Sequence, residues 1–192
     1  LDTLPITEGS LLRPKGPYSE SKLKSDEIAL QADGLDTTVI RPRTVVDKRR
    51  AGIFQILFDW VSRGKRVYLV GPGDNQFQMI SGRDLANAAI ASAKSENAIG
   101  KIYNIGTDEF YTMREAYEDL INFANTGSTV SGLPRYPTKF GMWLLDSLDK
   151  SPLTTFHYKT IDKDFYFDVS KAKKQLQWEP KDSNSDCMQR GY

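Results

Sequence analysis

Tyr18 and Lys22 are the two residues whose types and spacing could best support catalysis. They lie four positions apart in a segment rich in helix-forming residues, so their side chains would share one face of a helix, about one turn apart. A tyrosine normally holds its proton at neutral pH, but a neighbouring ammonium group stabilises the phenolate and favours proton transfer nearer neutrality. Taken alone, such a pair is more often an exposed tyrosine beside a solvated lysine, so its context decides.

The segments around this pair alternate between helix and strand. Pro17 and Gly34 bound a helix expected over residues 18–32. Apolar periodicity and turn residues predict further elements: helices over 53–62, 84–93 and 113–124, the last capped by Thr112, and strands over 35–40, 66–70 and 101–105. Helices of this length between strands favour an α/β fold with parallel pairing.

The alternation ends after Thr126. We expect a short strand over 130–133, an amphipathic helix over 138–148 and a last helix over 170–176 begun by Asp168, a layout more typical of a lid on a sheet. The apolar run at 140–148 could line a substrate lid or form the inner face of a packed helix, and packing is the commoner use. The same reasoning assigns three aromatic residues to the core or an interface, namely Trp60, Trp143 and Trp178.

Five short motifs follow one another along the chain. They are PYSESK at 17–22, Arg41-Pro42, Asp84-Leu85-Ala86, YNIG at 103–106 and FDVSKAKKQLQWEP at 167–180, the last with Gln177 in the place of a glycine. Their order and content resemble the extended short-chain dehydrogenase/reductase superfamily, and within it the NAD-dependent epimerase/dehydratase family. The matches span nearly the whole chain, which makes them far more specific than Tyr18 and Lys22 alone.

The resemblance implies the C-terminal part of a Rossmann-like doubly wound α/β fold plus a smaller substrate-binding lid. The end of the sheet would occupy about 1–125 and the lid about 126–192 of a single domain over 1–192. The chain starts without methionine and contains no G-x-x-G-x-x-G loop, so we expect that loop and an assisting serine or threonine upstream. We therefore expect a C-terminal fragment that is inactive by itself.

The same resemblance implies hydride transfer with NAD or NADP. Tyr18 would exchange a proton with the substrate, and Lys22 would also bond the cofactor ribose, so both residues contact the cofactor. Pro42 and Arg43, at the R-P turn that lies against the nicotinamide in the family, are the further candidate cofactor contacts.

Thr44, Phe77 and Gln78 are the candidate substrate-binding residues. Sugar-nucleotide members of the family usually have an aromatic residue and an asparagine after the R-P turn, where this chain has Arg43 and Thr44. They often have an arginine around Phe77 that clamps the diphosphate, which a phenylalanine cannot do. The basic residues at 48–50 could restore phosphate binding, although such a cluster is more often solvated surface.

Three functions remain open on this basis. The first is an NAD(P)-dependent epimerase/dehydratase or oxidoreductase acting on a nucleotide sugar or related hydroxy compound. The second is a reductase of an apolar substrate, similar to 3β-hydroxysteroid dehydrogenases. The third is a non-catalytic nucleotide-sensing or scaffold module, against which the Tyr18 and Lys22 pair argues, because a binding module needs no tuned phenol.

Composition excludes several partners. The formal charge of +1 speaks against nucleic acid or an anionic membrane as the main partner and favours a small molecule. No apolar run reaches the roughly 20 residues that a membrane span needs, and no signal peptide is evident, so we expect a cytoplasmic protein. One cysteine, Cys187, and one histidine, His157, are too few for a disulfide or a zinc site. Leu23 and Leu30 give the first helix an apolar stripe that could contact a second copy in a homodimer or pack within the chain.

Overall fold

The computed structural model describes residues 3–14, 16–48, 50–148 and 161–192. The helices within these residues are α1 (Pro17–Leu30), α2 (Gln55–Ser62), α3 (Gly82–Ala93), α4 (Met113–Ala124), α5 (Arg135–Ser147), α7 (Ser170–Leu176) and α8 (Asn184–Gly191). Two short 3-10 helices are η1 (Gly52–Phe54) and η2 (Glu96–Ala98). The strands are β1 (Val39–Pro42), β2 (Thr44–Val45), β3 (Arg66–Val70), β4 (Met79–Ile80), β5 (Ile102–Ile105) and β6 (Thr129–Leu133). This is the α/β class that the helix and strand alternation predicts.

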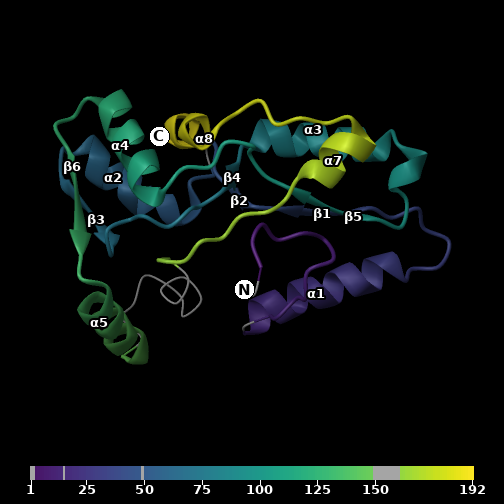
Figure 1. Ribbon diagram of the computed structural model, residues 1–192, viewed down its shortest axis with the longest axis horizontal. Helices are drawn as coiled ribbons and strands as arrows, with labels where there is room; N and C mark the ends of the chain where they lie inside the picture. Colours follow the sequence, from purple (N-terminus) through teal and green to yellow (C-terminus); the bar gives the residue numbers. More distant parts are fainter. Residues whose placement is uncertain (1–2, 15, 49, 149–160) are drawn as a thin grey trace.

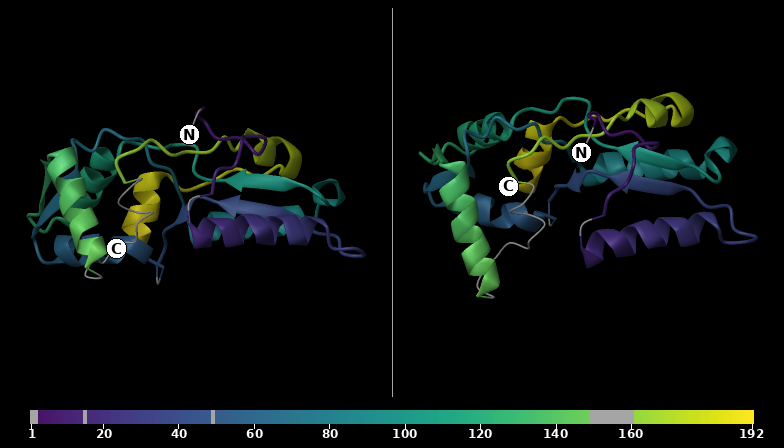
Figure 2. Two further views of the ribbon diagram at one scale, coloured as in Figure 1. Left: turned by 90° about the horizontal axis from the view of Figure 1, so that it is seen from below. Right: turned by 60° about the horizontal axis from the view of Figure 1, so that its bottom comes forward.

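All three strand pairs are parallel: β1 with β5, β2 with β4, and β3 with β6. Figure 1 shows the pairs following one another along the long axis, with β1 and β5 at one end and β3 and β6 at the other. In the same view α3 and α7 cover one face of the β1–β5 pair, and α1 lies on the opposite face (Figures 1 and 2). Helices on both faces of a parallel sheet are the layout of a doubly wound fold.

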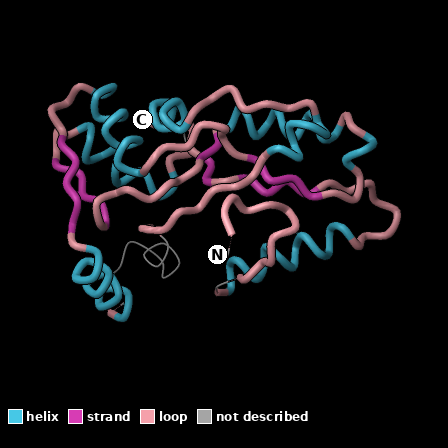
Figure 3. Tube along the Cα trace, in the orientation of Figure 1, coloured by secondary structure: helices cyan, strands magenta, loops and turns pink. Residues whose placement is uncertain are grey.

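Two clusters of buried side chains form the core. The first joins η1, α2, β3, β4, α4 and α8 around fully buried residues such as Val61, Met79 and Leu120. The second joins α3, β5 and α7 around Ala88, Tyr103 and Ala172, which are likewise fully buried. The tube view in Figure 3 shows long irregular segments that connect the two ends of the molecule. Much of the backbone in the middle of the molecule therefore lies outside helices and strands.

Helix α1 lies against β1 with little burial. Gly16, at φ 94°, precedes Pro17, which occupies the first turn, where a missing N–H costs nothing. No residue of α1 is fully buried, and an ion pair of 2.8 Å between Asp26 and Arg41 ties the helix to β1. Leu23 and Leu30 share the face of Asp26 and are half-buried, so the stripe considered for a homodimer is turned toward the chain's own strand.

Most predicted elements are confirmed within one to three residues at each end. The first strand differs, because residues 35–38 are irregular and Arg41 and Pro42 belong to β1. The two-residue strands β2 and β4 and helix α8 were not predicted, since neither short pairs nor a mostly polar helix give a clear apolar period. His157 lies outside the described residues.

Helix α5 contradicts one expectation. Packing was favoured for residues 140–148, but α5 has no buried residue, and Phe140 and Trp143 are 63% and 51% exposed. Its charged residues Arg135 and Lys139 turn instead toward Asp162, which lies 2.7 Å from the Lys139 ammonium group. Trp178 is buried and Trp60 packs against the first core cluster, as predicted for both.

Searches of the described residues for two further features were negative. No helix there is long and apolar enough to cross a membrane. No group of three or more histidine, cysteine or acidic residues there could hold a metal ion.

Candidate active site

Tyr18 and Lys22 lie on the first two turns of α1 and face solvent. Tyr18 is 79% exposed and Lys22 is also exposed, and neither side chain has a hydrogen-bond partner among the described residues. Ser21, between them, is not available as a third polar group, because its hydroxyl donates to the Tyr18 carbonyl at 2.8 Å. The phenol and the ammonium group are therefore left for a ligand or for solvent.

Helix α1 and strand β1 run in opposite directions, because the chain leaves α1 through a loop and returns along β1. The 2.8 Å ion pair between Asp26 and Arg41 joins the second half of α1 to β1, and no interaction among the described residues joins Tyr18 or Lys22 to that strand. Pro42, the last residue of β1, is exposed, and Thr44 at the start of β2 is half-buried. Ligands of open parallel sheets bind outside the carboxyl ends of the strands, where Pro42, Arg43 and Thr44 lie.

Arg43 lies between β1 and β2 and has an unusual environment. It is 8% exposed, and its guanidinium carbon lies 4.1 Å from the centre of the Phe165 ring, 5.1 Å from that of Phe77 and 5.3 Å from that of Phe167. Its backbone N–H donates to the Ile105 carbonyl at 2.8 Å, which fixes the base of the side chain at the end of β5. The three phenylalanines are partly exposed and form a rim around the cation, here called the phenylalanine rim.

Gln78, a candidate substrate contact, is fully buried and bonded to backbone on two sides. Its Nε2 donates to the Thr107 carbonyl at 2.7 Å, and its Oε1 accepts from the Phe167 N–H at 2.8 Å. Gly106, the glycine of the YNIG motif, makes this possible, because a Cβ there would lie 2.4 Å from the Gln78 amide carbon. The structure thus gives Gln78 the position of a clasp that holds Phe167 in the phenylalanine rim.

Phe77 is fixed from two further directions. It forms a parallel β-bridge with Phe165, and its carbonyl accepts from the Asn184 amide of α8. Asn184 is fully buried, and its Oδ1 accepts from the Met79 N–H at 2.9 Å. Sequence reasoning missed Phe165, Phe167 and Asn184; the alternating aromatics in DFYFD at 164–168 were the available signal for the first two.

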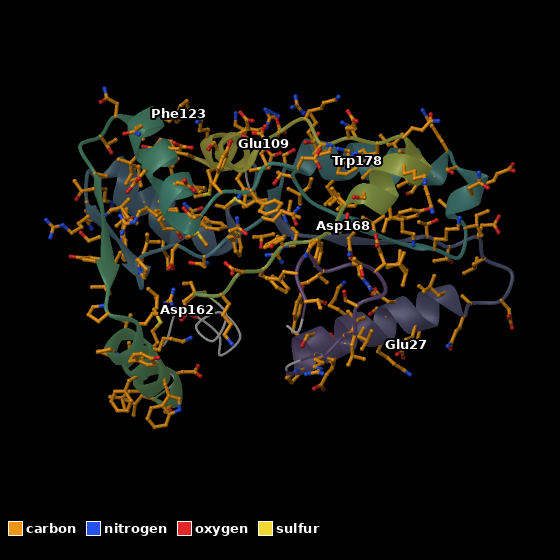
Figure 4. All side chains as sticks on the ribbon, in the orientation of Figure 1. Glu27, Glu109, Phe123, Asp162, Asp168 and Trp178 are labelled. Atoms are coloured by element: carbon orange, nitrogen blue, oxygen red, sulfur yellow. The ribbon has the colours of Figure 1, made fainter. Side chains whose placement is uncertain are left out.

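The Asp84-Leu85-Ala86 motif serves structure. Asp84 is fully buried, its N–H is capped by Ser81, and its Oδ2 accepts from the N–H groups of Lys181 and Asp182 at 2.8 Å each. The Trp178 indole donates to the Asp84 carbonyl at 3.1 Å, where α7 and α3 meet (Figure 4). A surface hollow of about 470 Å³ beside Trp178 lies over α3 and α7, on the sheet face opposite α1, and contains none of the candidate residues.

Comparison with known families and curated proteins gives consistent matches. The sequence model of the "NAD dependent epimerase/dehydratase family" matches residues 2–106. A protein of Sinorhizobium fredii, "Uncharacterized protein y4nG", is 41% identical over 191 residues, which are 98% of this chain and 48% of that protein. A "dTDP-glucose 4,6-dehydratase" of Streptomyces griseus is 34% identical over 109 residues, 52% of this chain and 32% of that protein. The chain spans about half the length of the first of these relatives and a smaller share of the second.

Solved structures share the fold. A UDP-glucose 4-epimerase of Thermotoga maritima with UDP-glucose has a TM-score of 0.75 at 21% identity, over 100% of this chain and 57% of that one. A UDP-glucuronic acid 4-epimerase of Bacillus cereus in complex with NAD has a TM-score of 0.73 at 21% identity, over 97% of this chain and 53% of that one. At this level of identity the likeness concerns the fold, and the chain again covers little more than half of each.

Proposed function

The chain belongs to the NAD-dependent epimerase/dehydratase family, and we propose that it forms the catalytic and substrate-facing part of an NAD(P)-dependent enzyme of this kind. The observation that carries the proposal is the Tyr18 and Lys22 pair, one turn apart on the first two turns of α1 and unpartnered among the described residues. Support also comes from two relatives of the same fold, one solved with NAD and one with UDP-glucose.

In this proposal Tyr18 is the acid or base and Lys22 its partner. The dinucleotide, when bound, supplies or accepts the hydride at its nicotinamide. Tyr18 gives or takes the matching proton at its phenolic oxygen, and the Lys22 ammonium group stabilises the phenolate and holds a ribose hydroxyl. The exposed hydroxyl and ammonium fit this use, because neither is committed to another described residue. Pro42 and Arg43, at the end of β1, would form the wall beside the nicotinamide.

We propose that the substrate is a nucleotide sugar or a related hydroxy compound. Its site would be built from Thr44 and Phe77, with Gln78 acting through the loops that it clasps. The curated relative named as a dTDP-glucose 4,6-dehydratase supports this class over an apolar steroid-like compound. Helix α5, with its exposed aromatic side chains, is the segment proposed as a lid over that site.

A homodimer is the proposed assembly, with α1 contributing to the contact. Because Leu23 and Leu30 are half-buried on the face of α1 that pairs with β1, the outer face of the helix would have to supply the contact. Ile28, 60% exposed, is the apolar residue on that outer face.

The proposal is tested by Tyr18→Phe in the longer protein that contains this chain. The change deletes the transferable proton and keeps the ring, so turnover should fall by about 100-fold or more while cofactor affinity changes little. Tyr68→Phe is the matched control, because Tyr68 is 47% exposed on β3, outside the proposed site and lid, and it should leave turnover unchanged. Steady-state kinetics with nucleotide sugars, together with NAD(P) titration, give both quantities.

Turnover of Tyr18→Phe within about threefold of the parent would remove Tyr18 from the acid/base role. Equal losses in Tyr18→Phe and Tyr68→Phe would assign the effect to folding. Lys22→Met should lower both turnover and cofactor affinity, which separates its role from that of Tyr18.

A further inference from the structure

Arg43 carries a buried charge without a counter-charge. No acidic oxygen of the described residues lies within ion-pair distance of it, and its Nε and Nη2 atoms are both buried without a hydrogen-bond partner. The arginines and lysines that do form ion pairs among the described residues have side chains at least 17% exposed. Arg43 is more buried than any of them, at 8% exposure, and has no acidic partner among the described residues. Buried polar groups in native proteins are normally partnered, so an unpartnered guanidinium needs an explanation.

The phenylalanine rim compensates only part of this cost. Ring faces attract a cation, and Phe165 at 4.1 Å is well placed for it. Aromatic carbons, however, are poor acceptors for the in-plane N–H groups of a guanidinium, which match the oxygens of a carboxylate or phosphate. Burial lowers the pKa of Arg43 to about 9 from its ordinary value of 12.5, and no neighbouring acid offsets the effect. The side chain is thus held ready for an anion that none of the described residues supplies.

The surrounding backbone holds this arrangement in place. Arg43 is anchored to the end of β5, Phe167 is clasped by Gln78, and Phe77 is held by Asn184 and by its bridge to Phe165. Three segments distant in sequence, namely β5, residue 77 and residues 165–167, therefore meet around Arg43 directly after the end of β1. A surface arginine that merely packs its stem needs no such framework.

We propose that Arg43 is an anion-binding residue of the substrate site, and that it pairs with an oxyanion of the substrate, a phosphoryl or carboxylate group, at the phenylalanine rim. This proposal extends the proposed function. It rests on that function in one respect, namely that the anion bound by Arg43 belongs to the substrate. The ring of Phe77 cannot bind an anion, but the Arg43 guanidinium, 5.1 Å from the centre of that ring, can supply the charge from the position between β1 and β2. Substrates without an anionic group near the reacting carbon would leave Arg43 unpaired and bind poorly.

The test measures anion binding by this chain without cofactor or turnover. Inorganic pyrophosphate, inorganic phosphate and acetate are titrated at constant ionic strength, with chloride as the reference, and the thermal midpoint and heat of binding are recorded. We expect a rise in Tm with at least one oxyanion. Comparing the rise with pyrophosphate or phosphate to the rise with acetate shows whether the site prefers a phosphoryl or a carboxylate group. Arg43→Met should lower the affinity at least about tenfold, as expected for loss of charge-assisted hydrogen bonds.

Arg43→Met should also raise the Tm of the anion-free chain, because it replaces an unpaired buried charge by an apolar side chain of similar length. Arg66→Met is the matched control, since Arg66 is exposed at the start of β3, and it should keep the anion response. If Arg43→Met does not fold, Arg43→Lys keeps the charge without the planar fork and should show weaker binding.

An anion response that is absent, or equal in the parent and in the Arg43 variants, overturns the proposal. So does a loss of stability in Arg43→Met with no anion response in the parent, which would make Arg43 a structural cation of the rim. The turnover of Tyr18→Phe is independent of these outcomes, so the failure of either proposal can be recognised separately.

Discussion

Gly106 shows at the scale of one residue how a missing side chain positions another. Any Cβ at this site would lie within 2.4 to 2.7 Å of three Gln78 side-chain atoms, and Gln78 has no room to move because both ends of its amide are bonded to backbone. We expect Gly106→Ala to lower the free energy of unfolding by about 1–3 kcal/mol, as overpacking does in a filled core. It should also weaken anion binding, because Gln78 holds Phe167.

Urea denaturation of Gly106→Ala and of Gly141→Ala measures this. Gly141 lies inside α5 with nothing within 4 Å of an added Cβ, so alanine there should stabilise the helix by about 0.5–1 kcal/mol. If Gly106→Ala were as stable as the parent, the hydrogen bonds of Gln78 to Thr107 and Phe167 would not depend on the close approach of Gly106 to the Gln78 amide.

Single residues also show where sequence reasoning reaches its limit. Tyr18 and Lys22 could be picked out because their relation is local, four positions apart on one helix. Gln78 could not be assigned its partner, because Phe167 is 89 positions away and nothing local marks the contact. Arg43 was singled out as a departure from the family pattern, but its burial depends on three rings from two other segments.

At the scale of elements, the position of the Tyr18 and Lys22 pair depends on how α1 is held to β1. The helix has no buried residue, so the Asp26 and Arg41 pair, at 21% and 17% side-chain exposure, is the principal polar tie between them. Asp26→Asn would leave Arg41 largely buried without a counter-charge. We expect it to cost about 1–2 kcal/mol of unfolding free energy, less than a fully buried pair and more than a surface pair.

Chemical denaturation of Asp26→Asn and Asp59→Asn is the measurement. Asp59 pairs with Arg63 at 2.7 Å but at 41% and 61% side-chain exposure, so its loss should cost less than about 0.5 kcal/mol. Equal losses of unfolding free energy in the two variants would show that burial does not strengthen the ion pair between Asp26 and Arg41.

The elements themselves were predictable where their periodicity is strong. Helix α4 has both its apolar face and a capping box of Thr112 and Glu115, and its predicted bounds of 113–124 are those observed. Helix α8 could not be read from its polar sequence, because its burial comes from contacts with α4 and β4 rather than from an apolar stripe. The exposed face of α5 shows the converse, since apolar periodicity gave a helix but not its burial.

At the scale of the whole molecule, we propose that the chain supplies the substrate side of an NAD(P)-dependent enzyme, and the 192-residue sequence contains no pyrophosphate loop. Its sequence has no G-x-x-G-x-x-G, so titration of this chain with NAD or NADP should give a dissociation constant well above the order of a micromolar. Calorimetry measures it directly. Micromolar or tighter binding would show that the cofactor is held by residues other than those proposed.

The β1–β5 pair has one further consequence. The N–H of Val39 donates to the carbonyl of Lys101, just before β5, and that of Arg43 donates to the carbonyl of Ile105 in β5. The alternation of the ladder therefore turns the backbone groups of Ile40 and Pro42 to the other edge of β1, where no described strand pairs. Across β5, by contrast, Glu8 accepts the N–H of Asn104. Pro42 has no N–H to donate. Any strand that pairs with this edge of β1, from the longer protein or from another copy, would therefore lack one backbone hydrogen bond at Pro42, which makes that position the weakest point for pairing along the edge.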